Sequence, residues 1–137
     1  SGTVVVYDLG GGTFDCSVLS LSEGVFKVLS TNGDTYLGGD DFDRALMELA
    51  LKSLGWEGER DAELLQNLRD SAEKTKIALS SAEEAQFDLN GPSRTIFWTT
   101  KVTRAEFEGL IRPLIDRTID KCKAALRDAL PLLYVYN

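Results

Sequence analysis

Short apolar stretches separated by glycine-containing turns occupy the first thirty positions of the chain. Residues 3–7 are rich in valine, residues 13–21 alternate between apolar and polar, and residues 25–30 again carry valine and phenylalanine. A period of two and a β-branched composition are typical of strands. Because only tight turns separate the three segments, we expect them to pair as an antiparallel meander.

The spacing of apolar residues becomes helical after residue 40. One helix is expected to begin near Phe42, with Asp40 or Asp41 as its cap, and to end at Gly55. A second helix is predicted over residues 62–80. Each carries a single apolar stripe, which indicates one buried face.

A hairpin is predicted between the second and third helices. Residues 87–90 and 95–102 have strand composition, and Asn-Gly-Pro at positions 90–92 favours a turn between them. The chain shows no internal repeat and no linker-like stretch, so its 137 residues indicate one domain or one compact piece of a larger one.

The third predicted helix opens with a capping box, in which Thr103 and Glu106 satisfy each other's amide groups. Pro113 lies inside the helical pattern and is expected to kink it, because proline removes one amide donor. The pattern ends at Pro131, and residues 132–136 have strand composition.

Composition excludes several classes of function. The net charge of −7 disfavours a nucleic-acid surface and an anionic membrane, because both need basic patches. The absence of histidine excludes a Ser-His-Asp triad and histidine metal ligands. Two cysteines, Cys16 and Cys122, are too few for a disulfide framework and indicate a reducing, cytoplasmic compartment. No apolar run approaches the roughly 20 residues that span a bilayer.

The glycine-rich segment after the first strand carries the clearest chemistry. Gly10, Gly11 and Gly12 can direct amide groups into one small space, which makes a phosphate site. Asp8 and Asp15 flank these glycines, where carboxylates suit a hard cation such as Mg²⁺. A bare triple glycine is more often a simple hairpin turn, and that interpretation stays open on these residues alone.

The element after the glycines distinguishes between nucleotide-binding architectures. In P-loop and dinucleotide-binding folds a helix follows the glycines, whereas here an alternating strand follows them. No Lys-Ser or Lys-Thr follows them either, so the P-loop pattern fails. A phosphate loop at the tip of a hairpin favours the actin-like ATPase architecture.

A second candidate constellation lies on the helix over residues 62–80. Glu73, Lys76, Ile77 and Ser80 cover a narrow arc beside the apolar stripe and are suited to ribose and base edges. The alternative is a solvated face with a weak Glu-Lys pair. Likewise, Gly-Gly-Asp-Asp at residues 38–41, judged alone, is more simply explained as a helix lead-in.

Several of these motifs occur together and in order along the chain. They are YDLGGGTFD at residues 7–15, TNGDT at 31–35, LGGDDFD at 37–43, AEKTKIALSS at 72–81 and KVTR at 101–104. On these motifs the chain resembles the DnaK-type chaperones of the heat shock protein 70 family, in the second lobe of the ATPase domain. Within that family the chain looks most like the HscA branch, the chaperones of iron–sulfur cluster assembly, with the general DnaK type as the alternative. The residues that favour this branch are 22–26, Asp40, 110–114, 117–118 and 122–129.

The resemblance implies a mixed α/β, partial actin-like ATPase fold and a role for each candidate residue with ATP or ADP and Mg²⁺. Asp8, Thr13 and Asp15 would serve catalysis, with Asp8 facing Mg²⁺ through water. The nucleotide contacts would be Gly10, Gly11, Gly12, Thr13, Gly38, Gly39, Glu73, Lys76 and Ser80. Ile77 stands where many members carry an arginine that stacks on the base.

The resemblance also implies an organisation and partners. Residues 3–37 with 103–130 would form a core subdomain (IIA-like) and residues 38–102 a smaller one (IIB-like), leaving 131–137 as an unplaced tail. The first lobe, a J-type co-chaperone, a nucleotide-exchange factor and an unfolded or cluster-scaffold client would be partners. Because the family's first phosphate loop and catalytic lysine do not occur in this sequence, we expect the chain alone to be inactive. The alternatives are a module that binds the exchange factor, or a lobe of another actin-like ATPase or sugar kinase.

Overall fold

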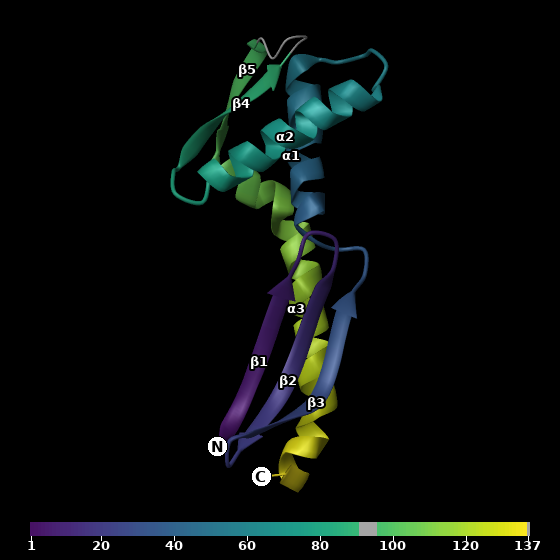
Figure 1. Cartoon of the computed structure of the whole chain (residues 1–137), viewed down its shortest axis with the longest axis vertical. Coiled ribbons are helices and arrows are strands. Elements are labelled where there is room, and N and C mark those ends of the chain that lie inside the picture. Colours follow the sequence, from purple (N-terminus) through teal and green to yellow (C-terminus); the bar gives the residue numbers. More distant parts are fainter. Residues whose placement is uncertain (91–95, 137) are drawn as a thin grey trace. The chain divides into compact units, whose positions relative to one another are not determined.

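The computed structural model describes residues 1–90 and 96–136. The elements in chain order are β1 (Gly2–Leu9), β2 (Phe14–Ser22), β3 (Val25–Asp34), α1 (Gly39–Leu54), α2 (Ala62–Ala78), β4 (Glu84–Asn90), β5 (Ile96–Thr103) and α3 (Arg104–Tyr136) (Figure 1). They fall into two compact units. The meander unit contains residues 1–41 and the chain from Pro113 onward, and the hairpin unit contains Phe42–Arg112.

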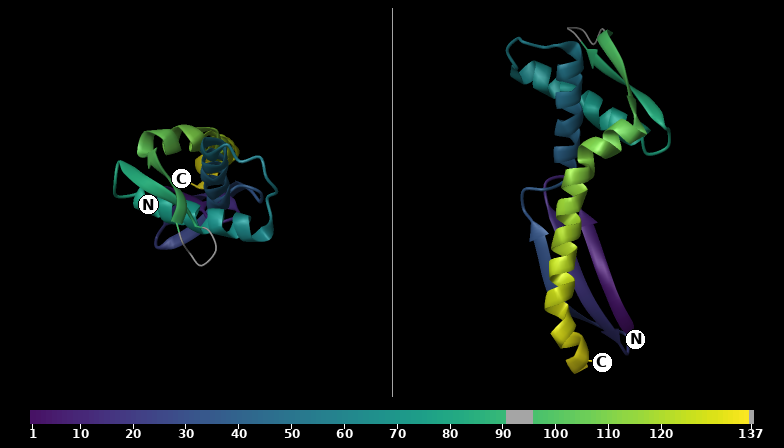
Figure 2. Two further views of the ribbon diagram at one scale, coloured as in Figure 1. Left: turned by 90° about the horizontal axis from the view of Figure 1, so that it is seen from above. Right: turned by 180° about the vertical axis from the view of Figure 1, so that it is seen from behind.

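The meander unit is a three-stranded antiparallel sheet in the order β1-β2-β3, as the sequence predicted. β1 pairs with β2 along its whole length. The pairing of β2 with β3 shifts register between Val18 and Leu19, which marks a bulge. The part of α3 after Pro113 follows one face of this sheet (Figure 2).

The core of the meander unit lies between that sheet face and α3. The period of two in β2 places Phe14, Cys16 and Val18 on the buried side, where they form one cluster with Ala125 and Ala129 of α3. All five side chains are almost fully buried. The alternation in the sequence therefore sets which face of the sheet the helix covers.

Polar contacts anchor both edge strands to α3. The Tyr7 hydroxyl of β1 donates to Oγ1 of Thr118 at 2.7 Å, and Thr118 in turn donates to the carbonyl of Ile115 at 2.6 Å. Ser30 of β3 donates to the carbonyl of Ala125 at 2.5 Å. Thr118 is fully buried, so these bonds satisfy a hydroxyl that would otherwise be costly to bury.

The hairpin unit contains α1 from Phe42 onward, α2, the β4–β5 hairpin and the start of α3, whereas the first turn of α1 belongs to the meander unit. Two hydroxyls of α2 fix the hairpin: Ser71 donates to the carbonyl of Asp88, and Thr75 donates to that of Gln86 at 3.0 Å. The predicted capping box is confirmed, because the Glu106 amide donates to Thr103 Oγ1 at 3.1 Å and the Thr103 amide donates to Glu106 Oε1 at 3.2 Å. The predicted turn at positions 90–92 lies partly outside the described residues.

Several predicted boundaries are wrong. β3 extends to Asp34 rather than ending at Ser30, and β4 begins at Glu84 rather than at Phe87. α1 begins at Gly39 rather than near Phe42, because the carboxylate of Asp41 reaches back and accepts the amide of Gly38 at 2.9 Å. α2 ends at Ala78, so Ser80 lies in the turn beyond the helix, where its amide donates to the carbonyl of Ile77 at 3.1 Å.

A further boundary concerns the tail. α3 continues through Pro131 to Tyr136, where strand composition was expected. Leu132 and Leu133 pack against the core of the meander unit, and this burial offsets the amide lost at the proline. Within residues 1–90 and 96–136, no helix has the length and apolar character needed to cross a membrane.

Candidate functional site

The glycine loop connects β1 to β2 in the meander unit. β1 ends at Leu9 and β2 begins at Phe14, so a strand follows the glycines, as predicted. The amide of Gly10 donates to the carbonyl of Thr13 at 2.9 Å and closes the loop at its base. Gly11, Gly12 and Thr13 are exposed.

The loop is fastened to the first turn of α1 by backbone hydrogen bonds. The amide of Gly39 donates to the carbonyl of Gly10 at 2.8 Å, and the amide of Asp40 donates to the carbonyl of Gly11 at 2.7 Å. Amide groups at a helix N-terminus lack partners within the helix, and here the loop carbonyls supply them. The positive end of the α1 dipole also favours these two carbonyl oxygens.

This docking fixes the direction of two further amides. In a trans peptide, the carbonyl of one residue and the N–H of the next point in opposite directions, and the described residues contain no cis peptide. Because the carbonyls of Gly10 and Gly11 face α1, the N–H groups of Gly11 and Gly12 point away from it. Neither amide has a hydrogen-bond partner in the described part of the chain. Two neighbouring free amides of this kind suit a phosphate oxygen.

Gly38 allows the loop and α1 to approach this closely. A Cβ at Gly38 would lie 2.3 Å from the carbonyl oxygen of Gly11 and 2.7 Å from the nitrogen of Gly12. Only glycine fits there, whereas a Cβ at Gly12 would meet nothing within 4 Å. Sequence reasoning placed Gly38 at the border of the nucleotide. Its packing against the loop depends on a tertiary contact that no local pattern encodes.

Two carboxylates flank the loop. Asp8 and Asp15 are direct partners in the β1–β2 register, and both are exposed. Neither forms an ion pair among the described residues. Two facing carboxylates without a counter-charge fit a hard divalent cation bound directly or through water. No group of three or more potential metal ligands occurs among the described residues, so Asp8 and Asp15 would contribute at most two protein ligands to such a cation.

Gly33 of β3 makes room for one of these carboxylates. It pairs with Asp15, and a Cβ at Gly33 would lie 2.9 Å from Asp15 Oδ1 and 2.4 Å from the carbonyl oxygen of Phe14. The neighbouring Asp34 accepts the amide of Tyr36 at 2.8 Å and Arg117 Nη2 at 2.6 Å. These contacts, the Tyr36 amide first, lower the pKa of Asp34 below its ordinary value.

The second candidate constellation lies at the C-terminal end of α2, in the hairpin unit. Glu73 and Ser80 are exposed, and Ile77 has 62% of its surface exposed. Lys76 is more covered, with 28% of its side chain exposed, and its Nζ lies 2.9 Å from Oδ1 of Asp43 in α1. Sequence reasoning missed Asp43, because an acidic residue at the start of a helix indicates only a favourable dipole.

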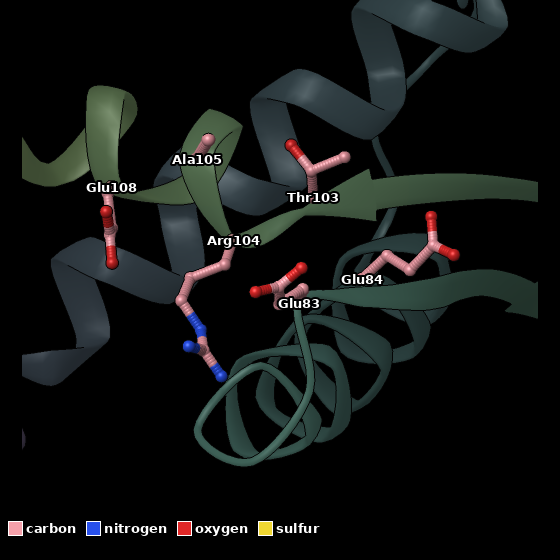
Figure 3. A pocket seen from close by; sticks show the side chains of 6 residues that line it. All are labelled: Glu83, Glu84, Thr103, Arg104, Ala105 and Glu108. Atoms are coloured by element: carbon pink, nitrogen blue, oxygen red, sulfur yellow. The ribbon is translucent and has the colours of Figure 1, made fainter.

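The turn that carries Ser80 is held by Arg104. Its Nε donates to the carbonyl of Leu79 at 2.9 Å, and its Nη2 donates to that of Ala82 at 3.0 Å. Figure 3 shows this side chain extending from the start of α3 toward that turn. It lines an open pocket of about 620 Å³ whose other walls are Glu83, Glu84, Thr103, Ala105 and Glu108. That pocket contains none of the predicted site residues.

The predicted site residues thus form two groups, each within one unit. The meander unit holds the glycine loop, its two carboxylates and the glycines before α1: Asp8, Gly10, Gly11, Gly12, Thr13, Asp15, Gly38 and Gly39. The hairpin unit holds Glu73, Lys76 and Ser80. Arg104, Gly33 and Asp43 support these groups without having been predicted.

Comparison with known proteins gives matches over almost the whole chain. A protein family described as "Hsp70 protein" matches residues 1–131. The chaperone protein HscA of Proteus mirabilis (strain HI4320) is 52% identical over 128 residues, which cover 93% of this chain and 20% of that protein. The chaperone protein DnaK of Anaplasma marginale (strain St. Maries) is 50% identical over 135 residues, which cover 93% of this chain and 21% of that protein. The chain therefore spans about a fifth of the length of these two relatives.

Proposed function

Because the chain belongs to the Hsp70 family, we propose that it forms part of the ATP-binding site of a DnaK- or HscA-type chaperone. The predicted fold class is confirmed, since the chain is a mixed α/β structure with an antiparallel meander, a hairpin and three helices, as in a partial actin-like ATPase domain. One observation carries the functional proposal: the amides of Gly11 and Gly12, which have no hydrogen-bond partner among the described residues, lie in the loop that joins Asp8 to Asp15.

In this proposal the meander unit binds the phosphates. The amides of Gly11 and Gly12 would donate to phosphate oxygens, and the Thr13 hydroxyl would lie near the terminal phosphate. Asp8 and Asp15 would hold Mg²⁺, Asp8 through water. When bound, Mg²⁺ neutralises phosphate charge and lowers the barrier to phosphoryl transfer. The docking of the loop on α1 orients the two amides before any ligand arrives, which removes a reorganisation cost.

The hairpin unit would bind the nucleoside. Glu73 and Lys76 would contact the ribose hydroxyls, and Ser80 would contact the adenine edge. Arg104 supports Ser80 by fixing the turn in which it lies. Ile77 is exposed beside these residues and would offer the base an apolar contact instead of the cation–π contact of an arginine.

The division into two units supports a finer assignment. We propose that the meander unit corresponds to the core subdomain (IIA-like) and the hairpin unit to the smaller one (IIB-like). The partners would be those of the family: the first ATPase lobe, a J-type co-chaperone, a nucleotide-exchange factor and a client, in the cytoplasm. The identities to HscA and to DnaK are nearly equal, at 52% and 50%, so the proposal covers both an iron–sulfur client and a general one.

A titration with Mg·ADP tests the proposal. We expect the amide resonances of Gly11 and Gly12 to shift, with a Kd in the millimolar range or weaker, because losing even three charge-assisted hydrogen bonds from missing walls weakens binding by several powers of ten. The chain alone should release no phosphate from ATP. Unchanged glycine resonances would contradict the phosphate site. Micromolar affinity for Mg·ADP, or release of phosphate from ATP, would contradict the claim that this chain supplies only part of the nucleotide site.

A further inference from the structure

The residue that stands out in the hairpin unit is Asp43, on the buried face of α1. Every other buried side chain of α1 is apolar. These apolar side chains are Phe42, Leu46, Met47, Ala50 and Leu51. The Asp43 side chain is only 10% exposed. Carboxylates are rarely buried unless a partner compensates for the lost hydration, so this position requires a specific reason.

The compensating charge is Lys76 of α2, whose Nζ lies 2.9 Å from Asp43 Oδ1. A separation of 2.9 Å is typical of a charge-assisted contact between an ammonium group and a carboxylate. The contact holds the ammonium group near one point. Because an ammonium group has three N–H donors, those not directed at Asp43 can donate elsewhere.

Stability alone does not explain such a pair. Replacing a buried ion pair by well-packed apolar residues is often neutral or stabilising. Lysine has a flexible four-carbon side chain, and restricting it lowers the entropy lost when a ligand binds. A buried acid opposite one lysine is thus better explained by a requirement to fix the position of that lysine.

We propose that Asp43 is a positioning residue that fixes the Lys76 ammonium group for a ribose hydroxyl. This inference rests on the proposed nucleoside site, and it adds a residue from α1 to a group otherwise drawn from α2 and its following turn. Asp43 itself touches no ligand in this proposal. It acts only by fixing where the N–H donors of Lys76 lie.

The test compares ADP with 2′-deoxy-ADP, both with Mg²⁺, in NMR titrations of the whole chain. The wild-type chain should bind ADP about tenfold more tightly, the size expected of one hydrogen bond to a charged group. Asp43→Asn keeps the shape and removes the charge, and it should abolish this preference. Lys76→Met should do the same, and the double variant should add nothing further. Glu84→Gln breaks the exposed pair with Lys101 in the same unit and should leave the preference unchanged.

The outcomes distinguish failure of the nucleoside site from failure of the role of Asp43. A wild-type chain that binds neither nucleotide, or that binds both equally, contradicts the nucleoside site and this inference with it. A wild-type preference that survives in Asp43→Asn overturns the role of Asp43 alone.

A measurement on the wild-type chain covers the case in which Asp43→Asn does not fold. ¹⁵N relaxation of the side-chain ammonium groups should show Lys76 to be clearly more rigid than Lys101, whose side chain is 64% exposed. Equal mobility of the two ammonium groups would overturn the positioning role.

Discussion

Asp8 lies directly opposite Asp15 in the β1–β2 register, at the mouth of the glycine loop. Like charges facing each other across a strand pair destabilise the pair. Neither carboxylate is neutralised by a described cationic side chain. The chain therefore keeps an unfavourable contact beside two unpartnered amides, a combination that a bound cation and phosphate would relieve together.

The first prediction concerns Asp8→Asn. Because it removes one of two facing charges, this substitution should raise the free energy of unfolding by about 0.2–1 kcal/mol at low salt. It should also abolish any effect of Mg²⁺ on ADP binding. Urea unfolding and an NMR titration with and without Mg²⁺ measure the two effects.

Salt provides the control for Asp8→Asn. The gain in stability should shrink at high ionic strength, because exposed charges are screened. Lower stability in the Asp8→Asn variant would show that the two carboxylates do not repel each other, and the argument for a cation between them would fail.

The second prediction compares two glycines of the same region. Gly38→Ala places a Cβ 2.3 Å from the Gly11 carbonyl oxygen, so the backbone must move. We expect a loss of about 1–3 kcal/mol, the usual cost of overpacking, together with shifts of the Gly11 and Gly12 amide resonances. Gly12→Ala meets nothing within 4 Å and should be far better tolerated. Equal losses of stability in the two variants would contradict the close packing at Gly38.

The third prediction concerns acid stability. The Tyr36 amide and the Arg117 guanidinium lower the pKa of Asp34 below the ordinary 3.8. The ionised form is thus favoured by folding, so its contribution to stability is present above pH 3.8 and is lost as the pH falls through the folded pKa. Arg117→Gln should raise the Asp34 pKa part of the way back, which an NMR titration of the carboxyl carbon measures. An unchanged pKa would contradict the contribution of Arg117 to the shift.

The fourth prediction concerns the thiol of Cys122. Burial and the neighbouring Cys16 thiol raise its pKa to about 11, against an ordinary 9.0. Folding favours the neutral thiol, so stability should fall as the pH rises above 9.0. Alkylation of the folded chain by iodoacetamide should therefore be slow at neutral pH and should accelerate toward pH 11.

Cys16→Ala separates the causes of the Cys122 shift. It should lower the Cys122 pKa while leaving it above the ordinary value, because burial is the larger cause. Circular dichroism confirms folding of the variant. Fast alkylation of the wild-type chain at neutral pH would contradict the raised pKa.

Local patterns were sufficient to predict that the strands exist, which face of β2 is buried and where α3 begins, although not the end of β3 or the start of β4. The alternation around Phe14, Cys16 and Val18 identifies the buried face of β2 without any tertiary information. The capping box of Thr103 and Glu106 is likewise encoded within four residues. Both features depend only on residues that are close together in the sequence, so a local pattern is enough to predict them.

Features that depend on distant contacts were not predictable. The helix continues past Pro131 because Leu132 and Leu133 reach a core formed mainly by the strands. The constraint on Gly38 arises from Gly11, and the burial of Asp43 is matched by Lys76. In each case the partner lies more than twenty residues away, so spacing rules that cover one or two helical turns contain no information about it.

The two tryptophans of the chain, Trp56 and Trp98, both lie in the hairpin unit. Tryptophan fluorescence would thus report the unfolding of residues 42–112. It would not report the unfolding of the sheet that carries the glycine loop. Tyr7, whose hydroxyl is bonded to Thr118, is a native optical reporter for that sheet. A spectroscopist who records both emissions can learn whether the two halves of this chain denature in one step or in two.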